Sequence, residues 1–87
     1  MPNNPWLKDF PILAADENGT RLVYLDSAAT TQHPQQVLDA VVNYYTRDNA
    51  NPHRGVYDLA MRATDAHEGA RHRVAQFFHA DDDEIVF

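Results

Sequence analysis

Cysteine is absent from the 87 residues, and Lys8 is the only lysine. The lack of cysteine excludes disulfide bonds, thiolate metal sites and a nucleophilic thiol within this chain. A glycine-rich phosphate loop and a nucleophile elbow are missing as well, and no lysine lies in an apolar stretch. These absences exclude those particular catalytic and phosphate-binding groups from the chain.

Basic residues are scarce, with 7 against 13 acidic residues and a net charge of -6. A protein that neutralises phosphates needs a basic face, so the composition disfavours a nucleic-acid partner. The acidic run Asp81–Glu84 lacks the alternating acids and the glycine of a calcium-binding loop, and we interpret it as a solvated loop.

Long apolar runs are also lacking. No stretch approaches the roughly 18 apolar residues of a membrane span, and residues 1–6 lack a basic region followed by an apolar one, as a secretory signal has. We therefore expect a cytoplasmic protein without a membrane partner. Apolar residues still make up 44% of the chain, which is enough for a collapsed domain.

Two main helices and short strands are predicted along the chain. A helical turn is expected at Trp6–Phe10, a turn at residues 17–19 and a strand at residues 22–25. The first helix follows Pro34 and fades at residues 48–52, where asparagine and proline interrupt it. The fold class is therefore an α-rich α/β fragment.

The longer helix is predicted from an apolar stripe at helical spacing, formed by Leu59, Ala63, Ala66, Ala70, Val74 and Phe77. Glu68 and His72 are four residues apart and are expected to support this helix. Residues 84–87 form a β-like run, which needs a partner strand. We expect that partner to come from further polypeptide.

The five histidines show no spacing typical of a zinc site. His67 and His72 are five apart and point in different directions on a helix, so no metal site is predicted. His53-Arg54-Gly55 either holds a carboxylate or phosphate or is a helix entry with Arg54 in a surface ion pair. The loop at residues 26–31 either approaches a ligand or is a tight connection.

Two motifs in register resemble a known family. The run Tyr24-Leu25-Asp26-Ser27-Ala28-Ala29-Thr30-Thr31, followed by Pro34, is similar to the start of class V aminotransferase-fold enzymes. The run Asn49-Ala50-Asn51-Pro52-His53-Arg54-Gly55-Val56 resembles the cysteine desulfurase and selenocysteine lyase branch, of the type that serves iron–sulfur cluster assembly. The likeness extends from about Lys8 to Phe87.

The resemblance implies that residues 1–87 are the N-terminal segment, in the small-domain region, of a pyridoxal-phosphate (PLP) fold type I homodimer. Such an enzyme removes sulfur from L-cysteine, leaving alanine and an enzyme persulfide for a sulfur-acceptor protein. Its cofactor lysine and nucleophilic cysteine do not match any position here, so the chain alone is predicted to be inactive and to bind no PLP. Ala28 and Ala29 match the small-residue loop that lines the substrate side of the site, and His53 and Arg54 match the loop that reaches the active-site entrance near the dimer interface. All four are expected to be substrate-binding residues, and none of them is predicted to be catalytic or to bind the cofactor.

Two alternatives remain at this point. Another class V enzyme, such as a kynureninase-like hydrolase or an aminotransferase, would share the fold and the Asp26–Ala29 pattern. A free-standing helical interaction module would use the same helices to bind a partner without catalysis.

Overall fold

The structure is a computed structural model that describes residues 4–87. Met1–Asn3, on which part of the expectation about a secretory signal rests, lie outside the described residues. The chain divides into two compact units, Met1–Val42 and Asn43–Phe87, and each is described by itself.

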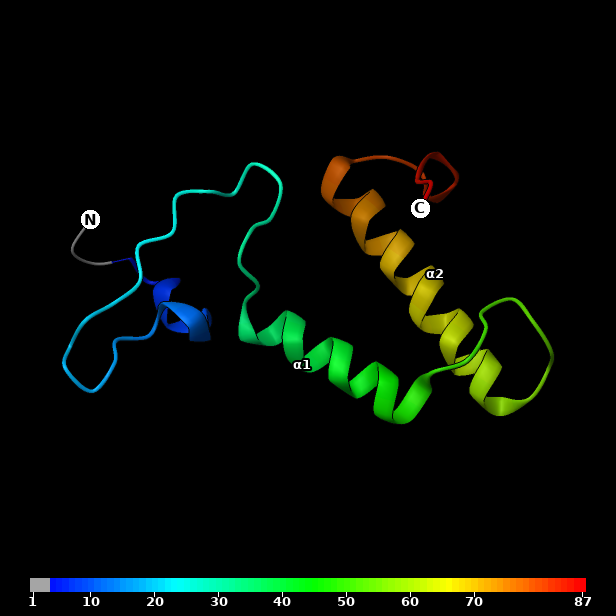
Figure 1. Ribbon diagram of the computed structural model, residues 1–87. Helices are drawn as coiled ribbons and strands as arrows, with labels where there is room; N and C mark the ends of the chain where they lie inside the picture. The colour runs from blue at the N-terminus through cyan, green and yellow to red at the C-terminus, as the bar shows by residue number, and fades with distance from the viewer. Residues whose placement is uncertain (1–3) are drawn as a thin grey trace. The chain divides into compact units, whose positions relative to one another are not determined.

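Short helical turns and one regular helix make up the first unit (Figure 1). The 3-10 turn η1 spans Leu7–Asp9, which confirms the expected turn, and η2 spans Pro11–Leu13. Pro11 suits the first position of η2 because its missing N–H would have no partner there. Helix α1 covers Gln35–Asn43, and Pro34 precedes it as predicted.

A polar turn at residues 16–20 connects the short helices to residues 21–26, which have no regular structure. The Asp16 carboxylate accepts backbone hydrogen bonds from Asn18 at 2.9 Å and Thr20 at 2.8 Å. Gly19 has a φ of +78°, a conformation that glycine adopts without steric cost. The turn predicted at residues 17–19 is therefore present, and its aspartate supplies the hydrogen bonds that close it.

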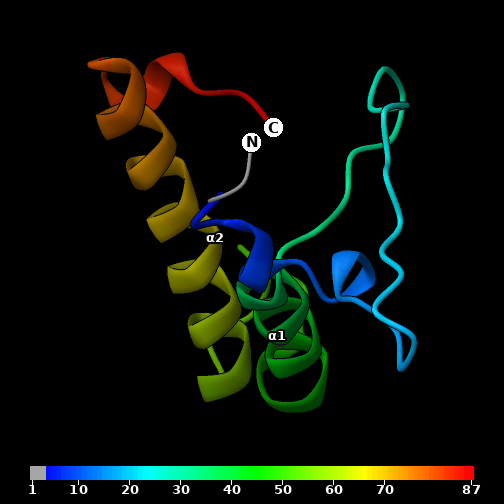
Figure 2. The same cartoon turned by 90° about the vertical axis from the view of Figure 1, so that its left-hand side faces the viewer.

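A long helix, α2, dominates the second unit and spans Asp58–Phe78. The π-helical turn η3 at Tyr44–Asp48 precedes it, and the 3-10 turn η4 at Asp82–Glu84 follows it. Both turns contact α2. Figure 2 shows the segment after α2 turning back at the end of the helix.

The buried face of α2 differs in part from the predicted stripe. Ala60, Ala63 and Ala75 are buried, whereas Phe77 is 79% exposed. Small alanine side chains let the flanking turns approach the helix axis closely, which explains why alanines rather than larger residues form the contact. Of the six stripe residues, only Ala63 is fully buried in the part of the chain that the structure describes.

The helix ends in a left-handed residue rather than a glycine. His79 has φ 56° and ψ 40°. The Ala80 N–H donates to the Ala75 carbonyl at 2.9 Å, and the His79 N–H donates to the Gln76 carbonyl at 3.2 Å. This pattern is a Schellman motif, which satisfies the last carbonyls of the helix.

The two predicted strands do not form within residues 4–87. Residues 22–25 and 85–87 are without regular structure, although Ile85 has the extended dihedrals φ -98° and ψ 120°. A strand needs a neighbouring strand to pair its N–H and C=O groups, and no second extended segment pairs with either one. The α-rich part of the predicted fold is thus present and its strand part is not.

The acidic run after α2 is more ordered than a solvated loop. Asp81 caps η4, and its N–H donates to Glu84 Oε2 at 3.1 Å in a capping box. All four acidic residues are exposed, as predicted. None of the described helices combines the length and the apolar character needed to cross a membrane.

Candidate functional site

Ala28 and Ala29 lie in a turn of the first unit, at residues 27–29, and both are exposed. The hydroxyl of Tyr24 reaches across the base of this loop to two carbonyl oxygens, that of Asp26 at 2.7 Å and that of Thr30. Because the hydroxyl bridges both ends of the loop, Tyr24 keeps the alanine turn closed. A ligand could then approach the backbone of two residues that carry only methyl side chains.

His53 and Arg54 lie in the second unit, in the loop between η3 and α2. His53 has a φ of 62°, which is uncommon for a residue with a side chain. Its N–H donates to the Thr64 hydroxyl at 2.8 Å, and that hydroxyl donates to the Ala60 carbonyl at 2.9 Å. Thr64 therefore fixes the backbone of the loop to the first half of α2.

Gly55 permits the sharp turn that follows His53. It has a φ of +72°, and a Cβ added there would approach the Tyr57 ring to 3.0 Å. Arg54 lies between His53 and Gly55 in the sequence, and its side chain is exposed. The surface ion pair considered for Arg54 is not formed with any residue from 4 to 87, which leaves the guanidinium open to solvent.

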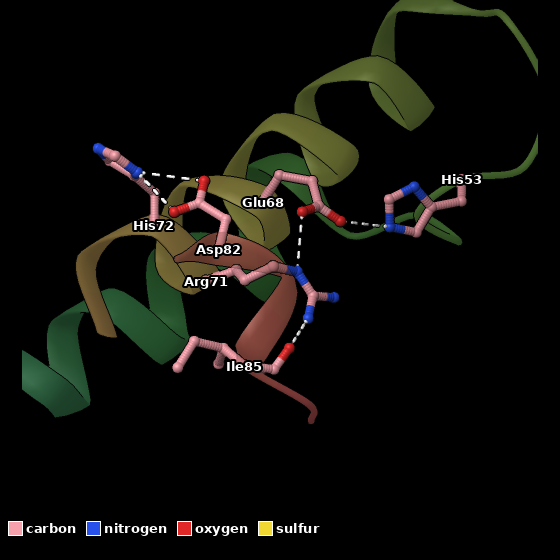
Figure 3. A network of polar contacts seen from close by, with 6 residues as sticks. All are labelled: His53, Glu68, Arg71, His72, Asp82 and Ile85. Atoms are coloured by element: carbon pink, nitrogen blue, oxygen red, sulfur yellow. Dashed lines mark hydrogen bonds and ion pairs between the residues drawn. The ribbon is translucent and has the colours of Figure 1, made fainter. Parts of the chain in front are cut away.

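Glu68 on α2 connects the loop to the helix (Figure 3). Its Oε1 lies 3.0 Å from His53 Nε2, and its Oε2 accepts a hydrogen bond from Arg71 Nε at 2.9 Å. The hydrogen bond from Arg71 holds the pKa of the Glu68 carboxyl below its ordinary value, and the nearby His53 and His67 act in the same direction. Glu68 is therefore a carboxylate at neutral pH.

His67 lies beside the same cluster and is half-buried. Its ring packs edge-on against His53 at 5.5 Å between centroids, and against Phe87 at 5.2 Å. One ligand atom from each of His53, His67 and Glu68 lies within 4.8 Å of the other two. Two imidazoles and one carboxylate therefore meet at one point of the molecule.

An open hollow of about 580 Å³ lies against this cluster. Its lining combines α2 and the C-terminal segment, namely His67, Glu68, Arg71, Asp82, Asp83, Ile85, Val86 and Phe87. Arg71 donates a hydrogen bond to the Ile85 carbonyl, and its guanidinium lies 5.1 Å from the centre of the Phe87 ring. Arg71 thus holds one wall of the hollow in place.

His72 turns away from the cluster. Its Nδ1 lies 3.0 Å from an Asp82 carboxylate oxygen (Figure 3). The expected support from a Glu68–His72 pair is therefore replaced by contacts from Glu68 to Arg71 and from His72 to Asp82. The prediction that His67 and His72 face different directions is confirmed.

Arg62 joins the two ends of the loop that carries His53. It contacts Asp48 at 3.0 Å, Asp58 at 2.6 Å and the Arg47 carbonyl at 2.9 Å. The loop is therefore closed at its base by Arg62 and held at its tip by Thr64 and Glu68.

Sequence reasoning identified the two loops but missed the residues that position them. Tyr24, Thr64 and Glu68 gave no signal at catalytic or metal-ligand spacing, because their partners lie in separate segments of the chain. The left-handed backbone conformation of His53 could not be predicted from the sequence either. Gly55 indicated a turn, but it did not indicate the direction in which the His53 imidazole points.

Comparison with known proteins places these loops in a family. The aminotransferase class-V sequence model matches residues 23–87. A "Probable cysteine desulfurase" of Streptomyces coelicolor is 57% identical over 82 residues, which is 92% of this chain and 20% of that protein. Proteins of the same name from Synechocystis and Staphylococcus aureus are 55% and 52% identical, over 84% and 97% of this chain.

The chain spans about a fifth of the length of these relatives, 17% of the Synechocystis protein and 21% of the Staphylococcus protein. The matched region includes the alanine turn, the His53 loop and the whole of α2. On the strength of the family match over most of its length, the chain belongs to the aminotransferase class-V family.

Proposed function

We propose that residues 1–87 are the N-terminal segment of a PLP-dependent cysteine desulfurase, which converts L-cysteine to alanine and an enzyme persulfide. The observation that carries this proposal is the identity of 52–57% with proteins named "Probable cysteine desulfurase", over nearly all of this chain. The same identity favours this reading over a kynureninase-like hydrolase or an aminotransferase of the same family.

The residues present do not form a PLP site. The cofactor is held as a Schiff base by a lysine and acts as an electron sink. Lys8 is exposed on η1, among short turns. The chain also has no cysteine to take the sulfur from the substrate. We infer that both groups belong to the remainder of a longer protein and that this chain alone is inactive.

Ala28, Ala29, His53 and Arg54 would serve the substrate in that longer protein. The exposed guanidinium of Arg54 offers a fork of donors that suits a carboxylate such as that of L-cysteine. Contacts hold both the backbone and the ring of His53 in place. Little conformational entropy would therefore be lost at His53 when a substrate binds. The alanine turn would leave room for close approach of the substrate backbone atoms.

The exposed apolar segments support a larger fold. Leu25 is 90% exposed and Val86 is 88% exposed, although both belong to stretches of strand-like composition. Apolar surface of this extent commonly marks a missing partner. We propose that residues 22–25 and 84–87 pair as strands with later parts of a PLP fold type I enzyme. That enzyme would be a cytoplasmic homodimer that passes sulfur to an acceptor protein for iron–sulfur cluster assembly.

The first test is the intact mass of the native protein in its source cells, detected through peptides of this chain. We expect a mass about five times larger, because the chain covers 20% of a typical relative. That protein should release alanine from L-cysteine, whereas the 87-residue chain should lose all PLP absorbance on dialysis. A native mass near 9.9 kDa would reject the desulfurase and favour a free-standing helical module.

The role of Arg54 has a separate test in the same native protein. Replacing Arg54 with Gln removes the guanidinium and should raise the KM for L-cysteine by about tenfold, the effect of losing one charge-assisted hydrogen bond. Arg73→Gln is the matched control, since Arg73 is exposed on α2 and lies outside both loops. An equal rise in KM for both variants would contradict a role for Arg54 in substrate binding.

A further inference from the structure

We propose that His53, His67 and Glu68 form a binding site for a divalent transition metal, with Zn²⁺ as the ion that suits this ligand set. The proposal does not depend on the desulfurase function, and it concerns side chains that the spacing of histidines in the sequence did not bring together. Two of the ligands are neighbours on α2, and the third comes from the loop before the helix.

The fold brings the three side chains together by two independent constraints. Thr64 holds the backbone N–H of His53 at 2.8 Å, one helical turn before Glu68. The left-handed φ of 62° then directs the chain so that His53 Nε2 reaches Glu68 Oε1 at 3.0 Å. His67 joins them because its ring packs edge-on against that of His53, at 5.5 Å between centroids.

The chemistry of the donors matches zinc. Two imidazoles and one glutamate make up the three-ligand set of many zinc sites, in which water takes the fourth position. The donor atoms lie within 4.8 Å of one another. In a tetrahedral zinc site with bonds of about 2.1 Å, they would be about 3.4 Å apart. Small rotations of the three side chains close that difference, because none of them is fully buried.

The charges around the cluster leave one glutamate oxygen for the metal. Arg71 occupies Oε2 of Glu68 and holds that carboxylate in place, while Oε1 lies 3.0 Å from His53 Nε2. This division resembles the outer hydrogen bonds that orient a metal-binding carboxylate. The positive charge of the Arg71 guanidinium disfavours the binding of a cation, whereas the net charge of -6 on the whole chain favours it.

Without a metal, the same residues make a His–Glu hydrogen bond and an edge-on ring contact, so the contacts alone would serve as a loop anchor. The two readings differ in one measurable property, the affinity for Zn²⁺. A metal site requires all three side chains together, whereas weak adsorption by surface histidines would depend on each of the five histidines equally.

The test titrates Zn²⁺ into the full 87-residue chain by calorimetry and records the ring nitrogen shifts of the histidines by NMR. We expect one bound ion, with shifts at His53 and His67. His53→Asn keeps a residue that tolerates a positive φ and removes the imidazole. His67→Gln and Glu68→Gln remove the other ligands. Each of the three variants should weaken binding by tenfold or more.

Two matched controls separate the site from surface adsorption. His79→Asn changes a histidine at the other left-handed position, and His72→Gln changes one that faces Asp82. Both variants should bind Zn²⁺ with the same affinity as the unsubstituted 87-residue chain. The proposal would be overturned if the unsubstituted chain did not bind Zn²⁺, or if the control variants lost as much affinity as the three ligand variants.

Discussion

Arg71 is predicted to hold the C-terminal segment on α2, and Arg71→Met should release it. The methionine retains an unbranched stem and a similar helix propensity but removes all three contacts of the guanidinium. These contacts are the hydrogen bond to the Ile85 carbonyl, the ion pair with Glu68 and the position over the Phe87 ring.

The size of the effect follows from these contacts. The hydrogen bond from a charged donor contributes about 1.5 kcal/mol and the cation–π contact about 0.5 kcal/mol. The ion pair with Glu68 lies within α2 and does not hold the C-terminal segment. The Arg71 side chain is 22% exposed, so solvent screens it only in part. The local free energy of opening should fall by about 2 kcal/mol, which is a factor of about 30 in the opening equilibrium.

Hydrogen exchange of two backbone amides measures this opening directly. The N–H groups of Glu84 and Ile85 donate to the carbonyls of Asp81 and Asp82, at 3.0 Å and 3.2 Å, and report on the turn η4. In Arg71→Met both amides should exchange about 30 times faster, while amides in the middle of α2 keep their rates. Arg73→Gln is the control and should leave all of them unchanged. A change of less than about threefold in Arg71→Met would refute the reasoning.

Three further substitutions test the positioning of the two loops and the end of α2. Thr64→Val removes the hydroxyl that accepts the His53 N–H, so that amide should exchange faster by about fivefold, corresponding to a loss of about 1 kcal/mol. Unchanged exchange would show that another group holds the loop. Tyr24→Phe removes the bridge between the Asp26 and Thr30 carbonyls. NMR order parameters at Ala28 and Ala29 should fall, and a rigid turn in this variant would contradict the role of the hydroxyl. His79→Gly replaces a side chain at a φ of 56° and should stabilise the chain by about 0.5–1 kcal/mol in urea unfolding, because the cost of the left-handed backbone outweighs the added freedom of the unfolded glycine. A loss of stability would mean that the imidazole makes a compensating contact.

The helices were predictable because their signals are local. Pro34 before α1 and the asparagine–proline break at residues 48–52 act through the backbone of a few neighbouring residues. The long apolar pattern predicted α2 for the same reason, although the face that becomes buried coincides with the predicted stripe only in part. Ala60 and Ala75 are buried because η3 and η4 contact α2, and the pattern along the helix does not encode those contacts.

The predicted strands are absent because strand formation, unlike helix formation, depends on a distant segment of the chain. Residues 22–25 and 85–87 have the composition of strands, but a strand is stabilised by hydrogen bonds to another segment. No partner segment pairs with them in residues 4–87, so neither segment forms a ladder. Composition alone cannot show whether such a partner is present.

The sequence by itself determined the family, the two helices and the two loops, because these depend on residue identity and on spacing along the chain. It also determined that the chain lacks the cysteine and any lysine besides Lys8 that such chemistry would use. Only the tertiary structure decided that His53 faces Glu68 and His67, since that meeting depends on one left-handed residue and one threonine hydroxyl. Contacts between distant segments depend on the direction that the backbone takes. The backbone conformation of a single residue such as His53 cannot be predicted from the residues next to it in the sequence.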